Sequence, residues 1–130
     1  MRYRRLWVSL GVLVVVWSSL ITAQTSPSRL YDAIRTDNRA GLRAMVQSAA
    51  AANTKDDGGK TPLMYAAAVG SIDAVKFLID KGADVNAQNE SGLTALILAA
   101  TDLSKVRLLV DRGANVNATT RLGRTALFLA

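Results

Sequence analysis

A segment of this chain is repeated, and this repetition restricts the possible folds more than any other feature. The sequence KGADVNAQNESGLTALILAA at residues 81–100 returns in altered form as RGANVNATTRLGRTALFLA at residues 112–130. A shift of 33 residues aligns Thr94 with Thr61, and after residue 100 the shift becomes 31. Periods of this length are typical of repeat proteins, in which each unit buries its apolar side against the next unit.

The first half of the unit predicts a short helix with defined ends. Thr61 can accept a hydrogen bond from a free backbone N–H at the helix start, and Pro62 suits the first helical position, where no donor is needed. An apolar helix is expected over residues 63–68, and its alanines allow a neighbouring helix to approach closely. Gly70 is expected to end it.

The second half of the unit predicts an amphipathic helix followed by an extended finger. Ser71 can cap this helix. Apolar residues recur at helical spacing and predict one buried stripe, made by Ile72, Val75, Leu78 and Ile79. Gly82 ends the helix, because glycine reaches the left-handed conformation at little cost. Residues 84–92 then form a finger that leads into the next unit.

The next copy differs from this unit in the connection between its two helices. Asp102 replaces Ser71 as the predicted cap, and the counterparts of Val69 and Gly70 are missing. We therefore expect a tight connection between the two helices of this copy.

A weaker copy precedes these two and is more polar. Shifting by 33 residues again aligns Leu30 with Leu63, and Asn38 falls where it can cap a second helix. A polar terminal copy is typical of a repeat that shields the stack from water. The predicted division is a linker at 24–27, a capping repeat at 28–58, and full repeats at 59–91 and 92–122.

The last copy, at residues 123–130, covers only the start of a first helix. The preceding helix has three apolar residues that should pack against the next repeat: Val106, Leu109 and Val110. Only the start of that next repeat is present. We expect the sequence to be a fragment of a longer protein, and the 130-residue chain to be marginally stable or to self-associate.

The unit resembles an ankyrin repeat, and the matching residues are specific when taken together. They are Gly59-Lys60-Thr61-Pro62-Leu63, Ala66-Ala67, Gly70, Val75-Lys76-Phe77-Leu78 and Gly82-Ala83-Asp84-Val85-Asn86-Ala87. The family has histidine where Met64, Ile97 and Phe128 stand, so apolar packing must replace its hydrogen bonds here. The resemblance implies an all-α solenoid in which each repeat adds a β-hairpin-like finger to two helices.

The N-terminus predicts a secretory signal peptide. Three arginines, at positions 2, 4 and 5, precede an apolar stretch at residues 6–17, and small residues lead to a cleavage site after Ala23. The chain is then of an exported bacterial type, periplasmic or secreted. The alternative is an uncleaved membrane anchor at residues 6–23.

Composition excludes most catalytic chemistry. The chain has no cysteine and no histidine, so we expect no cofactor, no metal site and no enzyme activity. Asp56 and Asp57, followed by two glycines, predict a turn rather than an acid/base pair. Beyond the three N-terminal arginines, 13 basic residues face 10 acidic ones without a run of like charge, which does not favour a nucleic-acid partner.

The resemblance implies a protein partner bound on the concave face of the stack. The positions that match the family's variable sites are Asp57, Lys60, Tyr65, Val69, Glu90, Ser91, Leu93, Leu98, Arg121, Leu122 and Arg124. Tyr65 is favoured among them, although it can equally be a partly buried spacer between helices. The alternative function is the docking portion of a larger exported enzyme or electron-transfer protein.

Overall fold

The computed structural model describes residues 27–130, so the predicted leader and most of the predicted linker lie outside it. The helices are α2 (Pro27–Arg35), α3 (Arg39–Met45), α4 (Ala49–Ala52), α5 (Pro62–Val69), α6 (Ile72–Asp80), α7 (Ala95–Leu98), α8 (Leu103–Asp111) and α9 (Ala126–Leu129). Within this range no β-strand is present, which confirms the all-α class. Pro27 was predicted to belong to the linker and is instead the first residue of α2, a position that suits proline.

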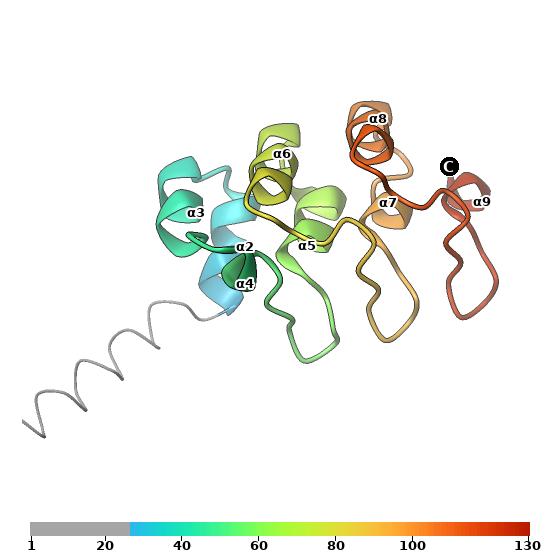
Figure 1. The fold of residues 1–130 in the computed structure, drawn as a ribbon, viewed down its shortest axis with the longest axis horizontal. Coiled ribbons are helices and arrows are strands. Elements are labelled where there is room, and N and C mark those ends of the chain that lie inside the picture. The colour runs from blue at the N-terminus through green and yellow to red at the C-terminus, as the bar shows by residue number, and fades with distance from the viewer. Residues whose placement is uncertain (1–26) are drawn as a thin grey trace, which may run out of the picture.

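The helices form two layers, and loops extend from one side of the stack (Figure 1). The first helices of the successive repeats, α2, α5, α7 and α9, form one layer, and α3, α6 and α8 form the other. Helix α5 packs against α2, α6 and α7. Each repeat therefore buries its apolar side against its neighbours, as the period predicts.

The predicted helix caps are confirmed. The Thr61 hydroxyl accepts a hydrogen bond from the backbone N–H of Met64 at 3.3 Å. The Ser71 hydroxyl accepts from Ala74 in the same way, at 3.2 Å. Asn38 caps α3, and Asp102 caps α8. These side chains satisfy N–H groups that have no partner inside their helices.

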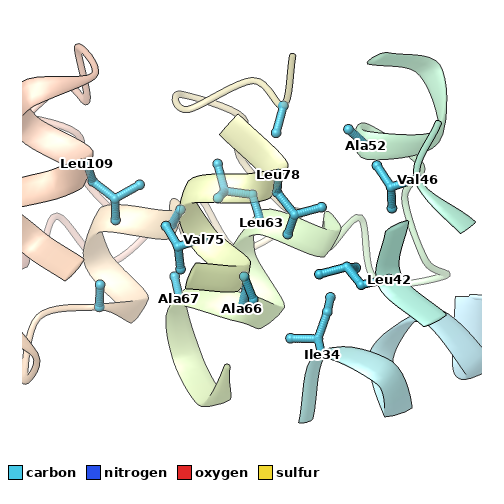
Figure 2. Packing of buried hydrophobic residues seen from close by; sticks show 14 of the residues in the cluster. Ile34, Leu42, Val46, Ala52, Leu63, Ala66, Ala67, Val75, Leu78 and Leu109 are labelled. Carbon is cyan, nitrogen blue, oxygen red and sulfur yellow. The ribbon is translucent and has the colours of Figure 1, made fainter. Parts of the chain in front are cut away.

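The core lies between the layers and continues from repeat to repeat. Figure 2 shows Leu63 of α5 beside Val75 and Leu78 of α6, all of them fully buried. Met64 and Ile97, which stand where the family has histidine, are 1% and 4% exposed, so apolar packing does replace the hydrogen bonds there. The prediction is wrong for Phe128, the third such residue, which is 70% exposed. A fully buried side chain of this size contributes about 1.5–3 kcal/mol.

The predicted stripe on α6 is wrong at its first position. Ile72 is 42% exposed, whereas Val75 and Leu78 are fully buried. Ile72 is the first residue of α6 and so lies at the N-terminal end of the helix. The preceding repeat has the charged Arg39 at the matching position. Ala74, which the stripe omitted, is buried instead.

The predicted tight connection in the next repeat is also wrong. Helix α7 has four residues, against eight in α5, and residues 99–102 connect it to α8. The two missing residues therefore shorten the helix and not the connection. Lys105 of α8 takes the place that Ala74 has in α6, and its Nζ donates a hydrogen bond to the carbonyl of Ala67, in α5, at 3.3 Å.

The capping repeat carries a short helix that its sequence alignment did not predict. Helix α4 stands where the other repeats begin their fingers, and the Ser48 hydroxyl caps it by accepting from Ala51 at 3.2 Å. A serine followed by four alanines was the signal that could have predicted it.

Gly70 is required for packing and not for its backbone conformation. Its φ of −86° is open to any residue. A Cβ there would lie 2.8 Å from Ile34 Cγ2 and 2.9 Å from Ala66 Cα. We expect Gly70→Ala to lower the free energy of unfolding by about 1–3 kcal/mol, measured by urea denaturation. Gly58→Ala is the control, because its Cβ would meet only an ordinary contact at 3.6 Å; equal effects of the two variants would contradict the packing role.

Candidate protein-binding face

The fingers and the first helices together form one face of the stack, which we call the inner face. We restrict the name fingers to the turn segments nearest the first helices, at residues 54–60, 87–93 and 118–124. The first helices are α2, α5 and α7. The structure places the predicted binding residues on these elements. Tyr65 and Val69 lie on α5 and Leu98 on α7, whereas Asp57, Lys60, Glu90, Ser91, Leu93, Arg121, Leu122 and Arg124 lie on the fingers. None of them is fully buried.

One polar side chain organises each finger. Asp56 accepts hydrogen bonds from the backbone N–H groups of Gly58 and Lys60 at 3.0 and 2.8 Å. Asn89 and Thr120 take the same place in the next two fingers, and each accepts from two backbone N–H groups. The prediction that Asp56 belongs to a turn is therefore confirmed. Because these bonds fix the backbone, the finger side chains are presented on a rigid loop.

Neighbouring fingers also touch directly. The backbone N–H of Arg121 donates to the carbonyl of Ser91 at 3.0 Å. Gly92 has a φ of +76°, and a Cβ on it would lie 3.1 Å from Arg121 N and from Thr119 O. The backbones of Ser91 and Arg121 therefore join adjacent repeats, and their side chains remain exposed.

The inner face contains a pair of aromatic rings of which the sequence predicted only one. Tyr31 of α2 stacks on Tyr65 of α5 with ring centroids 4.7 Å apart and 28° between the planes. The Tyr31 hydroxyl donates to the carbonyl of Lys60 at 3.1 Å. Tyr65 is thus a half-buried partner of the capping repeat and is still partly accessible. Tyr31 was missed because nothing in the alignment of repeats places it opposite Tyr65.

The pKa of Tyr31 follows from this position. Burial, and then the carboxylate of Asp56 and the ring of Tyr65, raise the pKa from its ordinary value of 10.0 to about 12. The folded chain therefore holds this proton more tightly than the unfolded chain. The resulting stabilisation is complete below pH 10 and is lost as the pH rises through about 12.

We expect Tyr31→Phe to remove the tyrosinate absorbance that appears latest in an alkaline titration. The same variant should lower the free energy of unfolding at neutral pH by about 0.5–1.5 kcal/mol, because the bond to Lys60 is lost while the ring stack is kept. Tyr65→Phe serves as the control. A late absorbance step that persists in Tyr31→Phe would contradict the assignment.

Adjacent repeats are also joined by asparagines. Asn86 Nδ2 donates to the carbonyl of Gly113 at 3.0 Å, and its Oδ1 accepts from the N–H of Asn115 at 2.7 Å. Asn53, one repeat earlier, bonds the backbones of Gly82 and Asp84 in the same way, at 2.9 and 2.7 Å. Asn86 belongs to the repeat pattern of the sequence, but that pattern does not predict this role. The two asparagines fix one repeat relative to the next, and so fix the spacing of the fingers.

An apolar groove lies at the end of the stack between α8 and α9. It has a volume of about 520 Å³. Several of its lining side chains are exposed: Leu103 (66%), Val110 (40%), Val116 (52%) and Leu127 (86%). Exposed apolar surface of this kind favours association in water.

We expect the 130-residue chain to self-associate through this groove, as sedimentation velocity would show. The double variant Leu103→Glu/Val110→Glu should be more monomeric. Ile72→Glu is a control, because Ile72 holds the position of Leu103 one repeat earlier and is also exposed, at 42%. A monomeric chain with a sharp, reversible unfolding transition would contradict this prediction.

No group of three or more His, Cys, Asp or Glu side chains among residues 27–130 could hold a metal ion. Buried side-chain nitrogen and oxygen atoms in that range all have hydrogen-bond partners. No helix within it is long and apolar enough to cross a membrane.

Comparison with known families assigns the class of the chain. The family described as "Ankyrin repeats (many copies)" matches residues 47–99, and "Ankyrin repeat" matches residues 91–121. Together these matches cover more than half of the chain. The chain belongs to the ankyrin-repeat proteins, as its repeat pattern indicates, and its repeats form a protein-interaction module.

Similar proteins carry these repeats as a small part of much longer chains. M-phase phosphoprotein 8 of Rattus norvegicus is 40% identical over 83 residues, which is 62% of this chain and 10% of the relative. The probable E3 ubiquitin-protein ligase XBOS33 of Oryza sativa subsp. japonica is 42% identical over 76 residues, 57% of this chain and 15% of the relative. Human inversin is 40% identical over 68 residues, 52% of this chain and 6% of the relative.

Proposed function

We propose that this chain is an exported module that binds a protein partner through its inner face, the concave face expected of such a stack. One observation carries the proposal: the accessible part of the Tyr31–Tyr65 stack lies on the same face as fingers whose backbones are fixed. Tyrosine offers a large contact area at low entropic cost, and rigid loops lose little freedom on binding.

The partner is best identified by photo-crosslinking from defined positions. A photoreactive amino acid replaces Val69, which is 52% exposed on α5, or Leu98 on α7. The same residue replaces Gln47, an exposed position outside the inner face, as the control. We expect one protein to be captured from Val69 and Leu98 and not from Gln47. Capture from all three positions would contradict an inner-face site.

The captured protein then allows a direct test with matched variants. Val69→Asp places a charge on the inner face and leaves both tyrosines in the sequence, and we expect it to weaken binding by about tenfold or more. Ile72→Asp is the control, because Ile72 is also an exposed apolar residue, at 42%, and lies on α6 in the second layer of helices. Equal affinities of the two variants would exclude Val69 and its surroundings from the contact.

Export is the second part of the proposal. Basic residues, an apolar stretch and small residues follow one another over residues 1–23, which is the order that a secretory signal requires. Recovery of a mature chain beginning at Gln24 outside the cytoplasm would support it. A chain that stays in the membrane fraction with Met1 in place would favour the anchor instead, and a cytoplasmic chain would contradict both.

A second function is favoured by the length of the relatives. The chain spans 15% or less of the relatives described above, whose repeats belong to larger proteins. We therefore propose, as the alternative, a docking portion of a larger exported enzyme or electron-transfer protein, with no catalysis by the described residues. Further repeats encoded beyond residue 130 would favour the first function, and a catalytic or haem-binding sequence there would favour the second.

A further inference from the structure

A row of cations runs along the second layer of helices. Arg43 of α3, Lys76 of α6 and Arg107 of α8 hold the same position in three successive repeats, separated by the shifts of 33 and 31 residues. All three are exposed, and none of their side chains forms a hydrogen bond or ion pair with another described residue. We call them the outer basic row. The row is not evident from the sequence, because only the fold brings residues so distant in sequence side by side.

The acidic groups beside Arg43 and Lys76 are already paired. Asp73 accepts a hydrogen bond from Arg39, one repeat earlier. Asp80 accepts from Arg112, one repeat later, at 2.8 Å. Each of these carboxylates has a cation partner in a neighbouring repeat, whereas Arg43 and Lys76 have no carboxylate partner within residues 27–130. Lys81 adds a further cation, with its Nζ 5.7 Å from the centroid of the Phe77 ring.

Two residues of the outer basic row lie at a groove between α3 and α6. It has a volume of about 220 Å³, and both Arg43 and Lys76 line it. Leu42 and Ala74 are the buried part of its floor, and Phe77 is half-buried beside them. The groove therefore combines free cations with an apolar floor.

We propose that the outer basic row binds an acidic polypeptide in an extended conformation. The first helices of successive repeats pack on one another, and packed helices lie about 8–10 Å apart, so cations at one position of successive repeats recur at about that distance. An extended chain rises about 3.3 Å per residue, so a carboxylate at every third residue recurs at nearly the same distance. Apolar side chains between the carboxylates can contact Phe77.

The carboxylates within the row argue against a continuous polyanion. Asp73 and Asp80 line the same groove as Arg43 and Lys76, and duplex DNA, which carries a charge about every 1.7 Å of its axis, cannot avoid them. The separate carboxylates of a peptide can be placed so that they avoid Asp73 and Asp80. This site lies on the second layer of helices and does not depend on the inner face.

The test uses fluorescence anisotropy at about 0.15 M salt with two labelled peptides of equal composition. One has glutamate at every third residue with serine between, and the other has the same glutamates in one block. We expect the spaced peptide to bind more tightly. Arg43→Glu/Lys76→Glu should weaken its binding by about tenfold or more. Arg107 is left unchanged, because Asp111 lies one helical turn from it.

The matched control is Arg29→Glu/Lys55→Glu, which changes the net charge equally at exposed positions outside the row. It should leave binding of the spaced peptide within about twofold. Should circular dichroism show that the glutamate variant does not fold, Arg43→Gln/Lys76→Gln takes its place. Equal binding of the two peptides, or equal losses in the two double variants, would overturn the proposal. Tighter binding of a DNA duplex, lost in the same variant, would also overturn it.

Discussion

Lys105→Met should lower the free energy of unfolding by about 2 kcal/mol, although it replaces one long side chain with another of similar size. The Lys105 side chain is only 9% exposed. Its Nζ donates to the carbonyl of Ala67 at 3.3 Å and lies 3.6 Å from Asp102 Oδ2. Methionine keeps the apolar contact and leaves the buried carbonyl without its partner.

Lys105→Ala should lower the free energy of unfolding further, by about 4 kcal/mol in total. It also removes buried methylene groups, each of which contributes about 0.8 kcal/mol. Arg107→Met is the control on the same helix, since Arg107 is exposed, and we expect a change within about 0.5 kcal/mol. Urea denaturation at concentrations where the chain is monomeric measures all three. A Lys105→Met variant as stable as the parent would show that the contact with Ala67 contributes nothing.

Asn86→Ala should also lower the free energy of unfolding by about 2 kcal/mol. The substitution removes one donor and one acceptor at once, so Gly113 O and Asn115 N both lose their partner in the neighbouring repeat. Asn86→Asp keeps the acceptor and removes the donor. We expect it to lower the free energy of unfolding by about half as much as Asn86→Ala does.

Asn117 provides a matched control for this prediction. It holds the position of Asn86 in the last full repeat, and its side chain bonds no other described residue. Asn117→Ala should change the free energy of unfolding by no more than about 0.5 kcal/mol. Equal losses from the Asn86 and Asn117 variants would mean that the effect arises within one repeat, and would refute a link between repeats.

The sequence predicted the features that are local to one repeat. Thr61, Ser71 and Asp102 cap the helices as expected, because a cap depends on residues within one helical turn. The buried positions Val75 and Leu78 follow from helical spacing. The all-α class and the family follow from these same residues.

Features that depend on two repeats at once were not predictable from periodicity. Lys105 reaches α5 from α8, and Tyr31 meets Tyr65 only after the capping repeat has docked. Ile72 was predicted to be buried because its spacing fits the stripe, yet burial at a helix end depends on what the neighbouring repeat covers. The predicted binding residues share a face because the repeats are regular, and their role in binding stays a prediction.

Hydrogen exchange, followed peptide by peptide with mass spectrometry, tests the stacking of repeats most directly. Helices α5 and α6 have a neighbouring repeat on both sides, whereas α9 lies at the end of the stack and has no buried residue. We expect amides of residues 62–80 to be the most protected and those of residues 126–130 to exchange first. Equal protection of these two segments, or none in either, would contradict the account.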